Sequence, residues 1–346
     1  MNPGGSAYTY RTLDVWRAVG ALMVIAFHST AKVIPPERGW WARALLAGWT
    51  GVFVFFPVSG YCIFAAVSRR ENATLAQFLA HRWRRIVPPY WASIAFTLVV
   101  AFAAAAFTQP PSYVNIGAGR WLAVVTLTQG LAGAPGAVNA AYWSLCFEEQ
   151  FYLLVALTLL APARHRWHWL MALTLLAGLY HLAQWPASWR WDGVFLEYWL
   201  EFACGIAAFA WLRVPGRRAW AAAVFAIALA SALAGRNGPL AISFGVSVAF
   251  VLLAPFDTAI AATRLGRVLM TLGVMSYSLY LVHAPLCLRL AKLAQRWDAP
   301  FMAGFALAVA VSLLAGVAFH LVVERRFLNR TAPFPPIIAS PHRQAA

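Results

Sequence analysis

Three ionisable residues stand in one apolar stretch near the start of the chain, LDVWRAVGALMVIAFHST. Asp14 and Arg17 are three positions apart, which lets them pair on a helix. His28 follows Arg17 by eleven positions, and eleven steps of about 100° return to nearly the same face, about 16 Å further along the axis. Ionisable groups in a membrane segment are retained mainly where they face a protein interior or a wet cavity. The pattern predicts that this helix forms the wall of a site.

The residue type at position 28 indicates acid–base chemistry. A histidine can take a proton from an acceptor hydroxyl as a general base near neutral pH. The structural alternative is that His28 donates to a backbone carbonyl while Arg17 extends its guanidinium to the membrane surface. We favour the catalytic interpretation, because three ionisable residues share one face of this segment.

Two further segments hold charged residues at helical spacing. In HRWRRIVPPYW, Arg82 and Arg85 are one turn apart and suit forked contacts with phosphate, although anionic lipid headgroups would fit them as well. In YWSLCFEEQFYLL, Glu148 and Glu149 are adjacent and so point to different faces of a helix. At most one of these carboxylates should point inward toward the helix that carries His28. The alternative is that both lie solvated at the membrane interface.

Uncharged polar residues gather in two other segments. SYSLYLVHAPL contains Ser276, Tyr277, Tyr280 and His283, which could support a site or simply connect helices by hydrogen bonds. GVFVFFPVSGY carries Ser59 beside small residues that allow close helix approach, so packing is our first interpretation of that segment.

The composition restricts the fold. Of 346 residues, 62% are hydrophobic and 11% are charged, and the mean hydropathy of +0.67 excludes an ordinary soluble domain. We predict an all-α integral membrane protein, a single bundle of about ten transmembrane helices with an amphipathic interfacial helix over 71–87. The short apolar segment 119–131 could be half-buried or re-entrant. The predicted spans are 13–34, 44–67, 88–108, 143–162, 167–185, 193–213, 219–235, 238–256, 268–288 and 299–322.

The charge of +16 is distributed unevenly over the predicted connections. One side of the bundle holds 17 basic residues and the other holds 8, so the positive-inside rule places both termini in the cytoplasm. The excess of basic residues therefore indicates the orientation of the chain in the membrane, and we expect no nucleic-acid partner. The four cysteines fall in predicted spans without metal-ligand spacing, and we interpret them as small apolar residues and predict no metal.

The chain divides into three predicted parts. Residues 1–12 form a cytoplasmic N-terminal segment, 13–328 a membrane domain and 329–346 a disordered cytoplasmic tail. No P-loop, GxSxG or HExxH motif is present in the sequence. Direct transfer of a group, or transfer through His28, is therefore favoured over a serine acyl-enzyme.

Six segments, in this order, resemble the acyltransferase 3 family of multi-span membrane acyltransferases, whose members modify bacterial surface polysaccharides, glycolipids and some natural products. Pro57 stands where that family usually has a plain apolar residue, and proline can kink a helix. Arg326 stands where the family often has proline. The matching segments are LDVWRAVGALMVIAFH, GVFVFFPVSGY, HRWRRIVPPYW, YWSLCFEEQFYLL, SYSLYLVHAPL and VVERRF.

The resemblance implies a division of roles among these residues. It implies that an acetyl or other short acyl group moves from cytoplasmic acetyl-CoA to a hydroxyl of a cell-surface carbohydrate or glycolipid, at the bacterial inner membrane. A second copy or a partner in polysaccharide synthesis would fit such a role. The implied catalytic set is His28, Arg17, Asp14, Glu148 and Glu149; the implied acyl-CoA contacts are Arg82, Arg84 and Arg85; the implied supporting set is Ser276, Tyr277, Tyr280, His283 and Ser59.

Two other classes of protein remain open at this stage. A multi-span transporter of a glycan or small solute would also need buried polar residues, although we find none of the inverted repeats typical of transporters. A non-enzymatic scaffold of a polysaccharide-synthesis complex would depend on surface helices rather than on His28 or Arg17.

Overall fold

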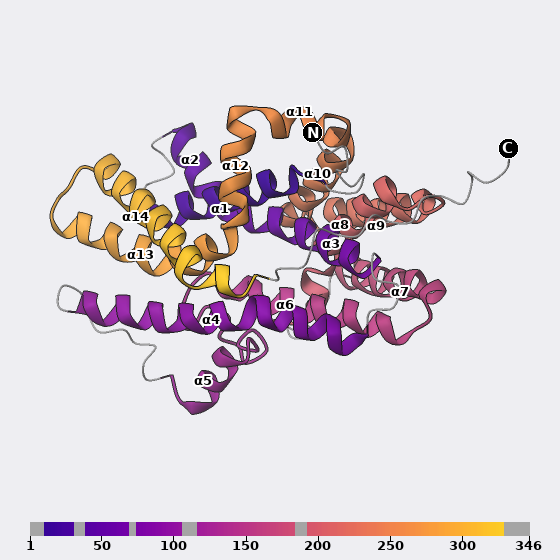
Figure 1. Cartoon of the computed structure of the whole chain (residues 1–346), viewed down its shortest axis with the longest axis horizontal. Helices are drawn as coiled ribbons and strands as arrows, with labels where there is room; N and C mark the ends of the chain where they lie inside the picture. Colours follow the sequence, from indigo (N-terminus) through magenta and orange to yellow (C-terminus); the bar gives the residue numbers. More distant parts are fainter. Residues whose placement is uncertain (1–9, 31–38, 69–73, 106–115, 184–191, 329–346) are drawn as a thin grey trace.

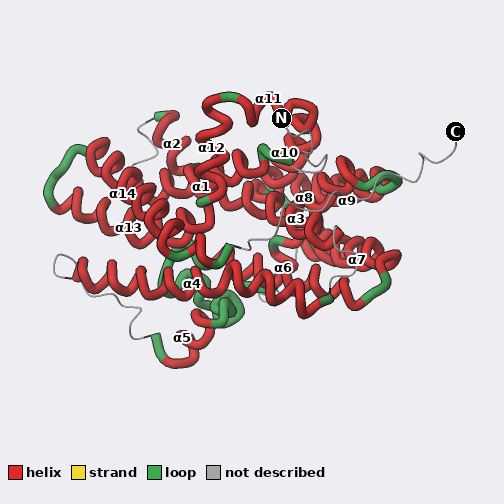
Figure 2. Tube along the Cα trace, viewed as in Figure 1, coloured by secondary structure: helices red, strands yellow, loops and turns green. Residues whose placement is uncertain are grey.

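The computed structural model describes residues 10–30, 39–68, 74–105, 116–183 and 192–328, and all regular structure within these ranges is helical (Figures 1 and 2). The predicted tail 329–346 and most of the N-terminal segment lie outside the described residues. The helices are α1 Leu13–Ser29, α2 Trp40–Leu46, α3 Val52–Ser68, α4 Leu75–Ala105, α5 Ala118–Val125, α6 Trp143–Leu157, α7 Ala163–Leu182, α8 Trp199–Arg213, α9 Arg218–Ala234, α10 Gly238–Leu253, α11 Asp257–Ala262, α12 Arg264–Val274, α13 Ser276–Arg296 and α14 Phe301–Val322.

Several helical segments have the length and apolar character of membrane spans. Five qualify by themselves, and a sixth does so if α12 and α13 are taken as one bent span. The all-helical membrane class is therefore supported, while the count of ten spans and the cytoplasmic termini stay predictions. The five are Trp40–Ser68, Leu75–Ala105, Trp143–Leu160, Gly238–Ala262 and Phe301–Arg326.

Two predicted boundaries are wrong. The interfacial helix over 71–87 is not separate, because α4 runs without interruption from Leu75 to Ala105 through Pro88 and Pro89. A proline inside a membrane helix is tolerated where neighbouring groups satisfy the freed backbone. Figure 1 shows this long helix crossing the molecule beneath α13 and α14.

The predicted span over 268–288 is also not one continuous helix. The chain bends by 72° between α12 and α13, at Met275. A methyl group on Gly273 would lie 1.8 Å from the carbonyl oxygen of Asp14, so α12 lies directly on the backbone of α1. After the bend, α13 packs along α14 (Figure 1). The bend therefore lets α12 pack on α1 while α13 packs on α14.

The start of α1 is held by a carboxylate from far along the chain. Asp257, the first residue of α11, accepts hydrogen bonds from the backbone N–H groups of Arg11 and Thr12 at 3.0 and 2.8 Å, and from the Thr12 hydroxyl at 2.8 Å. A negative charge at a helix N-terminus is favourable because the first N–H groups lack intrahelical partners. This cap anchors the helix that carries Arg17 and His28.

Small residues bring α1, α3 and α8 together, as their size predicts, although Gly51 ends a short 3-10 helix, Ala47–Gly51, directly before α3. A Cβ on Gly51 would lie 2.5 Å from the carbonyl oxygen of Gly20, and one on Gly60 would lie 2.0 Å from that of Phe202. A Cβ on Gly205 would likewise lie 2.0 Å from the carbonyl oxygen of Pro57. Only residues without a side chain permit such backbone contact.

Polar side chains from neighbouring segments satisfy the carbonyls that prolines leave without a partner. Pro57 cannot donate to the Phe53 carbonyl, which instead accepts the hydroxyl of Ser243 at 2.8 Å, and α3 remains one helix. Pro285 in α13 likewise frees the Leu281 carbonyl, which accepts the side-chain amide of Asn139 at 2.9 Å. In an apolar medium an unsatisfied carbonyl is costly, so these bonds permit prolines within the bundle.

Replacing Ser243 by alanine tests this compensation. We expect Ser243→Ala to lower the free energy of unfolding in mixed micelles by about 1–3 kcal/mol, because it leaves the Phe53 carbonyl buried and unsatisfied. In a Pro57→Ala background, a helical N–H replaces the missing donor and the cost should vanish. Ser247→Ala is the matched control, since that hydroxyl donates within α10, to the Ser243 carbonyl. Equal costs in both backgrounds would contradict the assignment.

Candidate active site

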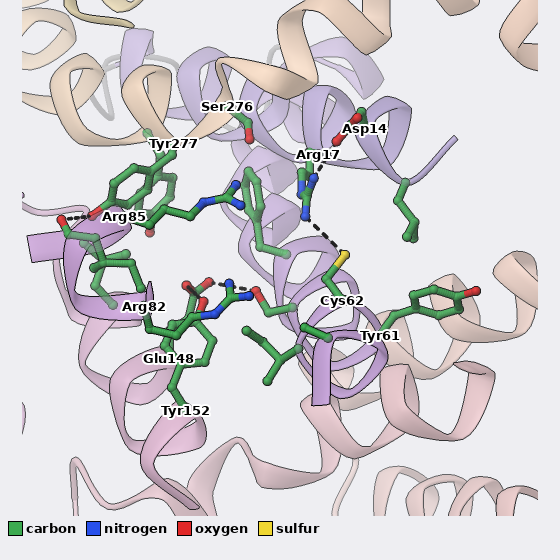
Figure 3. Close-up of a pocket in the computed structure, with 18 of the residues that line it drawn as sticks. Asp14, Arg17, Tyr61, Cys62, Arg82, Arg85, Glu148, Tyr152, Ser276 and Tyr277 are labelled. Carbon is green, nitrogen blue, oxygen red and sulfur yellow. Dashed lines mark hydrogen bonds and ion pairs between the residues drawn. The ribbon is translucent and has the colours of Figure 1, made fainter. Parts of the chain in front are cut away.

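A cavity of about 370 Å³ lies between α1, α3, α4, α6 and α13. We call it the arginine cavity, because Arg17, Arg82 and Arg85 extend into the same space from α1 and α4 (Figure 3). Its other polar lining residues are Tyr10, Asp14, Ser59, Tyr61, Cys62, Ser144, Glu148, Tyr152, Ser276, Tyr277 and Tyr280. Most of the residues singled out by sequence thus converge here from distant parts of the chain.

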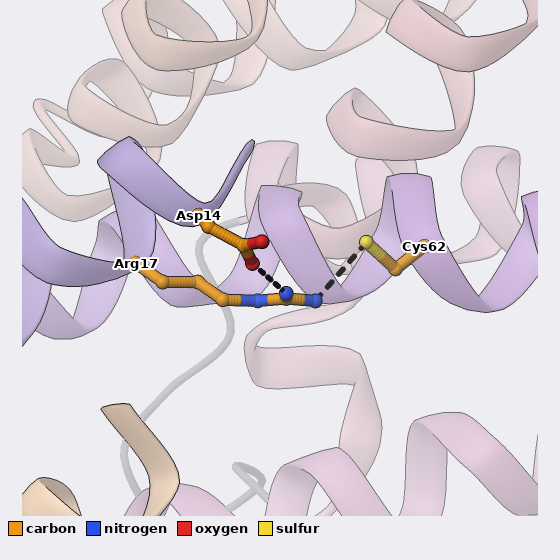
Figure 4. A network of polar contacts seen from close by, with 3 residues as sticks. All are labelled: Asp14, Arg17 and Cys62. Carbon is orange, nitrogen blue, oxygen red and sulfur yellow. Dashed lines mark hydrogen bonds and ion pairs between the residues drawn. The ribbon is translucent and has the colours of Figure 1, made fainter. Parts of the chain in front are cut away.

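Arg17 is held between two helices (Figure 4). Its guanidinium donates to the Asp14 carboxylate at 2.5 Å, as their spacing predicts, and to the Cys62 sulfur at 3.2 Å. Cys62 is therefore not the buried apolar residue that we expected, although Cys146, Cys204 and Cys287 are buried. The tie to α3 holds the Arg17 charge against the cavity.

The α4 arginines divide between the cavity and the outside. Arg82 and Arg85 line the cavity, whereas Arg84 is exposed and is not among the lining residues. Adjacent helical residues differ by about 100° in direction, so Arg84 cannot share the face of its neighbours. Within the described residues, Arg82 and Arg85 form no ion pair with a carboxylate, and the Arg82 guanidinium instead lies 5.7 and 5.9 Å from the ring centroids of Phe78 and Tyr152. The cavity thus holds cationic groups suited to an anionic ligand.

The structure distinguishes the two adjacent glutamates. Glu148 lines the arginine cavity and accepts hydrogen bonds from the hydroxyls of Tyr152 at 2.8 Å and Ser59 at 3.4 Å. Glu149 is not among the lining residues. Tyr152 lies four residues beyond Glu148 on the same face of α6, a spacing that could have revealed it in the sequence.

His28 lies in a different cavity from Arg17. This second space, of about 520 Å³, we call the histidine cavity. The two residues share α1 as predicted, but they face two separate spaces rather than one continuous polar wall. The histidine cavity is lined by Val24, Phe27, His28, Trp49, Val52, Ala140, Trp143, Tyr280 and Leu288.

A second histidine determines which nitrogen of His28 carries its proton. Nδ1 of buried His283 lies 2.8 and 3.1 Å from the carbonyls of Tyr280 and Leu279, which can only accept, so this nitrogen carries the hydrogen. Nε2 of a neutral His283 then accepts from Nδ1 of His28 at 3.1 Å, and the Val24 carbonyl accepts from the same Nδ1 at 3.0 Å. The lone pair of neutral His28 is therefore on Nε2. The backbone bond of the structural alternative is present, and together with His283 it makes Nε2 the nitrogen of His28 that can accept a proton.

Three residues near the start of α13 line the arginine cavity, and hydrogen bonds to other segments hold this part of the helix in place. Ser276 lines the cavity, and the Tyr277 hydroxyl donates to the Ile86 carbonyl of α4 at 3.0 Å. Ser278 donates to Glu324 at 2.5 Å, and the same carboxylate oxygen pairs with His320 at 2.8 Å. Sequence reasoning missed this buried pair, although Glu324 stands in the VVERRF segment.

A known protein family matches the segment that contains all the residues lining both cavities. Residues 10–321 match the family described as the acyltransferase domain. The chain belongs to this acyltransferase family. Among the described residues of this acyltransferase, no group of three His, Cys, Asp or Glu side chains could hold a metal ion.

Three curated relatives extend the comparison. The exopolysaccharide production protein ExoZ of Rhizobium meliloti (strain 1021) is 32% identical over 302 residues, covering 82% of this chain and 90% of the relative. A protein described as a membrane-bound transacylase, BcsY of Komagataeibacter xylinus, is 28% identical and covers 97% of this chain and 87% of the relative. The peptidoglycan O-acetyltransferase OatA of Listeria monocytogenes is 27% identical over 158 residues, 41% of this chain and 23% of the relative. No solved structure matches the chain.

The contrast between the two glutamates gives a direct test of the cavity. We expect Glu148→Gln to lower acyl transfer by about 10²-fold or more, because it changes the charge that faces the cavity arginines. Glu149→Gln is the matched control and should stay within a few-fold of the wild type. Initial rates of purified variants of equal thermal stability provide the measurement. The reverse order of effects would show that Glu149 is the carboxylate that acts.

Proposed function

We propose that this acyltransferase moves an acetyl or other short acyl group from cytoplasmic acetyl-CoA to a hydroxyl of a cell-surface carbohydrate or glycolipid. The observation that carries the proposal is the adjacency of a cavity rich in arginine and a cavity that contains His28, inside a chain of the acyltransferase family. An acyl transfer from an anionic donor needs both a cationic site and a base.

The arginine cavity suits the donor. Arg82 and Arg85 offer forked donors to the diphosphate of acetyl-CoA, and their positive charges have no carboxylate partner within the described residues. Arg17 adds a third cation that Asp14 and Cys62 hold in place. The flexible pantetheine arm would then extend toward the histidine cavity.

The histidine cavity suits the acceptor. Nε2 of His28 takes the proton of the attacking hydroxyl as its oxygen bonds to the thioester carbonyl carbon. When the tetrahedral intermediate collapses, the carbon–sulfur bond breaks and the same proton passes from His28 to the leaving CoA sulfur. The ester and free CoA are the products, so His28 ends the cycle neutral.

The names of the relatives support a carbohydrate acceptor. One relative is named for exopolysaccharide production and another for peptidoglycan O-acetylation. A location in the bacterial inner membrane follows from such an acceptor and a cytoplasmic donor. A second copy of the chain or a polysaccharide-synthesis protein would be a natural partner. Family membership favours this reading over a transporter or a scaffold.

Acetyl-CoA binding and turnover by the detergent-purified protein test the assignment of sites. We expect wild type to bind acetyl-CoA and to release CoA, and His28→Ala to bind while losing about 10²–10⁴-fold in turnover. Arg85→Ala should bind poorly, because it removes a phosphate contact. Arg84→Ala is the matched control: it removes an equal charge from the exposed face of the same turn and should leave binding unchanged.

Two results would contradict the proposal. If wild type had no affinity for any acyl-CoA, the donor assignment would be wrong and a transport function would become the better reading. If His28→Ala retained normal turnover in a folded protein, another group would be the base.

His283 should act through His28 rather than on the substrates. We expect His283→Leu to lower kcat by less than the loss of His28 does, with little change in KM for acetyl-CoA, because it removes the acceptor that orients the His28 ring. His283→Gln retains an acceptor and should recover part of the loss. A rise in KM as large as the fall in kcat, in both variants, would indicate general disruption instead.

A further inference from the structure

The arginine cavity and the histidine cavity meet at Tyr280. Among the described lining residues, this side chain alone belongs to both cavities. The boundary falls at one level of the bundle. On α3, Val52 lines the histidine cavity and Phe55 lines the arginine cavity. On α6, Trp143 lines the histidine cavity and Ser144 lines the arginine cavity.

The Tyr280 ring is fixed at this boundary from several sides. The side chain is 6% exposed, and its hydroxyl lies 2.6 Å from that of Ser144 on α6. The ring centroid lies 5.7 Å from that of Phe55 on α3, at 66°. One turn further along α13, the His283 ring hydrogen-bonds the Tyr280 carbonyl. An aromatic ring tied to α3 and α6 in this way closes the space between two helices.

We infer that Tyr280 is the partition between donor and acceptor and that it restricts the transferred acyl group to short chains. The inference rests on the proposed function, which places CoA phosphates at Arg82 and Arg85 and the base at His28. The acyl group is the leading end of the donor, so it must pass the Tyr280 ring before its carbonyl carbon reaches the acceptor. Each added methylene then has to fit the gap that this ring leaves.

A purely structural role for Tyr280 makes a different prediction. If the tyrosine only connects α6 and α13, the essential feature is its hydrogen bond to Ser144, and the ring has no influence on the substrate. Tyr280→Phe removes that bond and keeps the ring, whereas Tyr280→Ala removes both. A partition is retained in the first variant and lost in the second.

Relative activity with acetyl-CoA and butyryl-CoA is the decisive measurement. One methylene in a confined pocket changes kcat/KM by about 10- to 200-fold, so wild type should prefer acetyl-CoA by at least about 10-fold. Tyr280→Phe should keep this ratio, and Tyr280→Ala should bring it close to unity. Tyr280→Leu, with an apolar side chain smaller than the ring, serves in place of the alanine variant if that variant fails to fold. A wild-type ratio in a folded alanine or leucine variant would overturn the inference.

Thiol labelling gives a second readout that needs no turnover. Cys62 lines the arginine cavity, and the other three cysteines are buried. A membrane-impermeant methanethiosulfonate reagent, applied to right-side-out or inside-out vesicles, should label Cys62 of the wild type and of Tyr280→Phe from one side only. In Tyr280→Ala it should label Cys62 from both sides, and Cys62→Ser provides the blank.

The two readouts separate the partition from the proposed function. If wild type turned over no acyl-CoA but Tyr280→Ala opened Cys62 to the second side, the partition would stand and the donor assignment would fail. If Tyr280→Ala remained labelled from one side in the absence of turnover, the partition itself would be wrong.

Discussion

The positive charge of Arg17, held inside an apolar bundle, is the constraint on which the arrangement of the site depends. A guanidinium in such surroundings needs compensation, and the Asp14 carboxylate one turn earlier supplies it. Both residues lie at the start of α1, and Asp257 from α11 accepts hydrogen bonds from the N–H groups of Arg11 and Thr12 just before this helix. The bond to Cys62 then ties the charge to α3. Moving any of these elements would leave a half-buried ion without its partners.

A similar requirement governs the backbone. Prolines interrupt α3 and α13, and in each case a polar side chain from another segment reaches the freed carbonyl. These bonds connect α10 to α3 and the segment before α6 to α13. The helices that surround the two cavities are thus positioned by polar contacts that an apolar medium makes strong. Close backbone contacts at Gly51 and Gly273 pack α1 against the segment before α3 and against α12, and the contact at Gly60 packs α3 against α8.

The two cavities separate tasks that acyl transfer must combine. Cations gather in one cavity and the oriented histidine pair lies at the other, so the proposed function assigns donor binding and proton transfer to different residues. Tyr280 belongs to both spaces, and its neighbour His283 belongs to the histidine pair. A single turn of α13 therefore connects the boundary between the cavities to the tautomer of His28.

The sequence by itself determined what depends on neighbours along one helix and on composition. Apolar segments of spanning length indicated a helical membrane protein, and the three-residue spacing of Asp14 and Arg17 correctly predicted their pairing. The order of six short motifs indicated the acyltransferase family that residues 10–321 match. These features are local or additive, so no knowledge of packing was needed.

Only the tertiary structure decided which side chains share a cavity. It placed Glu148 rather than Glu149 at the arginines, put Arg84 outside, and joined His28 to His283 across 255 positions of sequence. It also continued α4 through its prolines and bent the chain at Met275, where helical periodicity indicated neither. Spacing along a helix gives the direction of a side chain relative to its own axis. The partner it meets depends on how neighbouring helices are rotated and packed, and that is a property of the whole bundle.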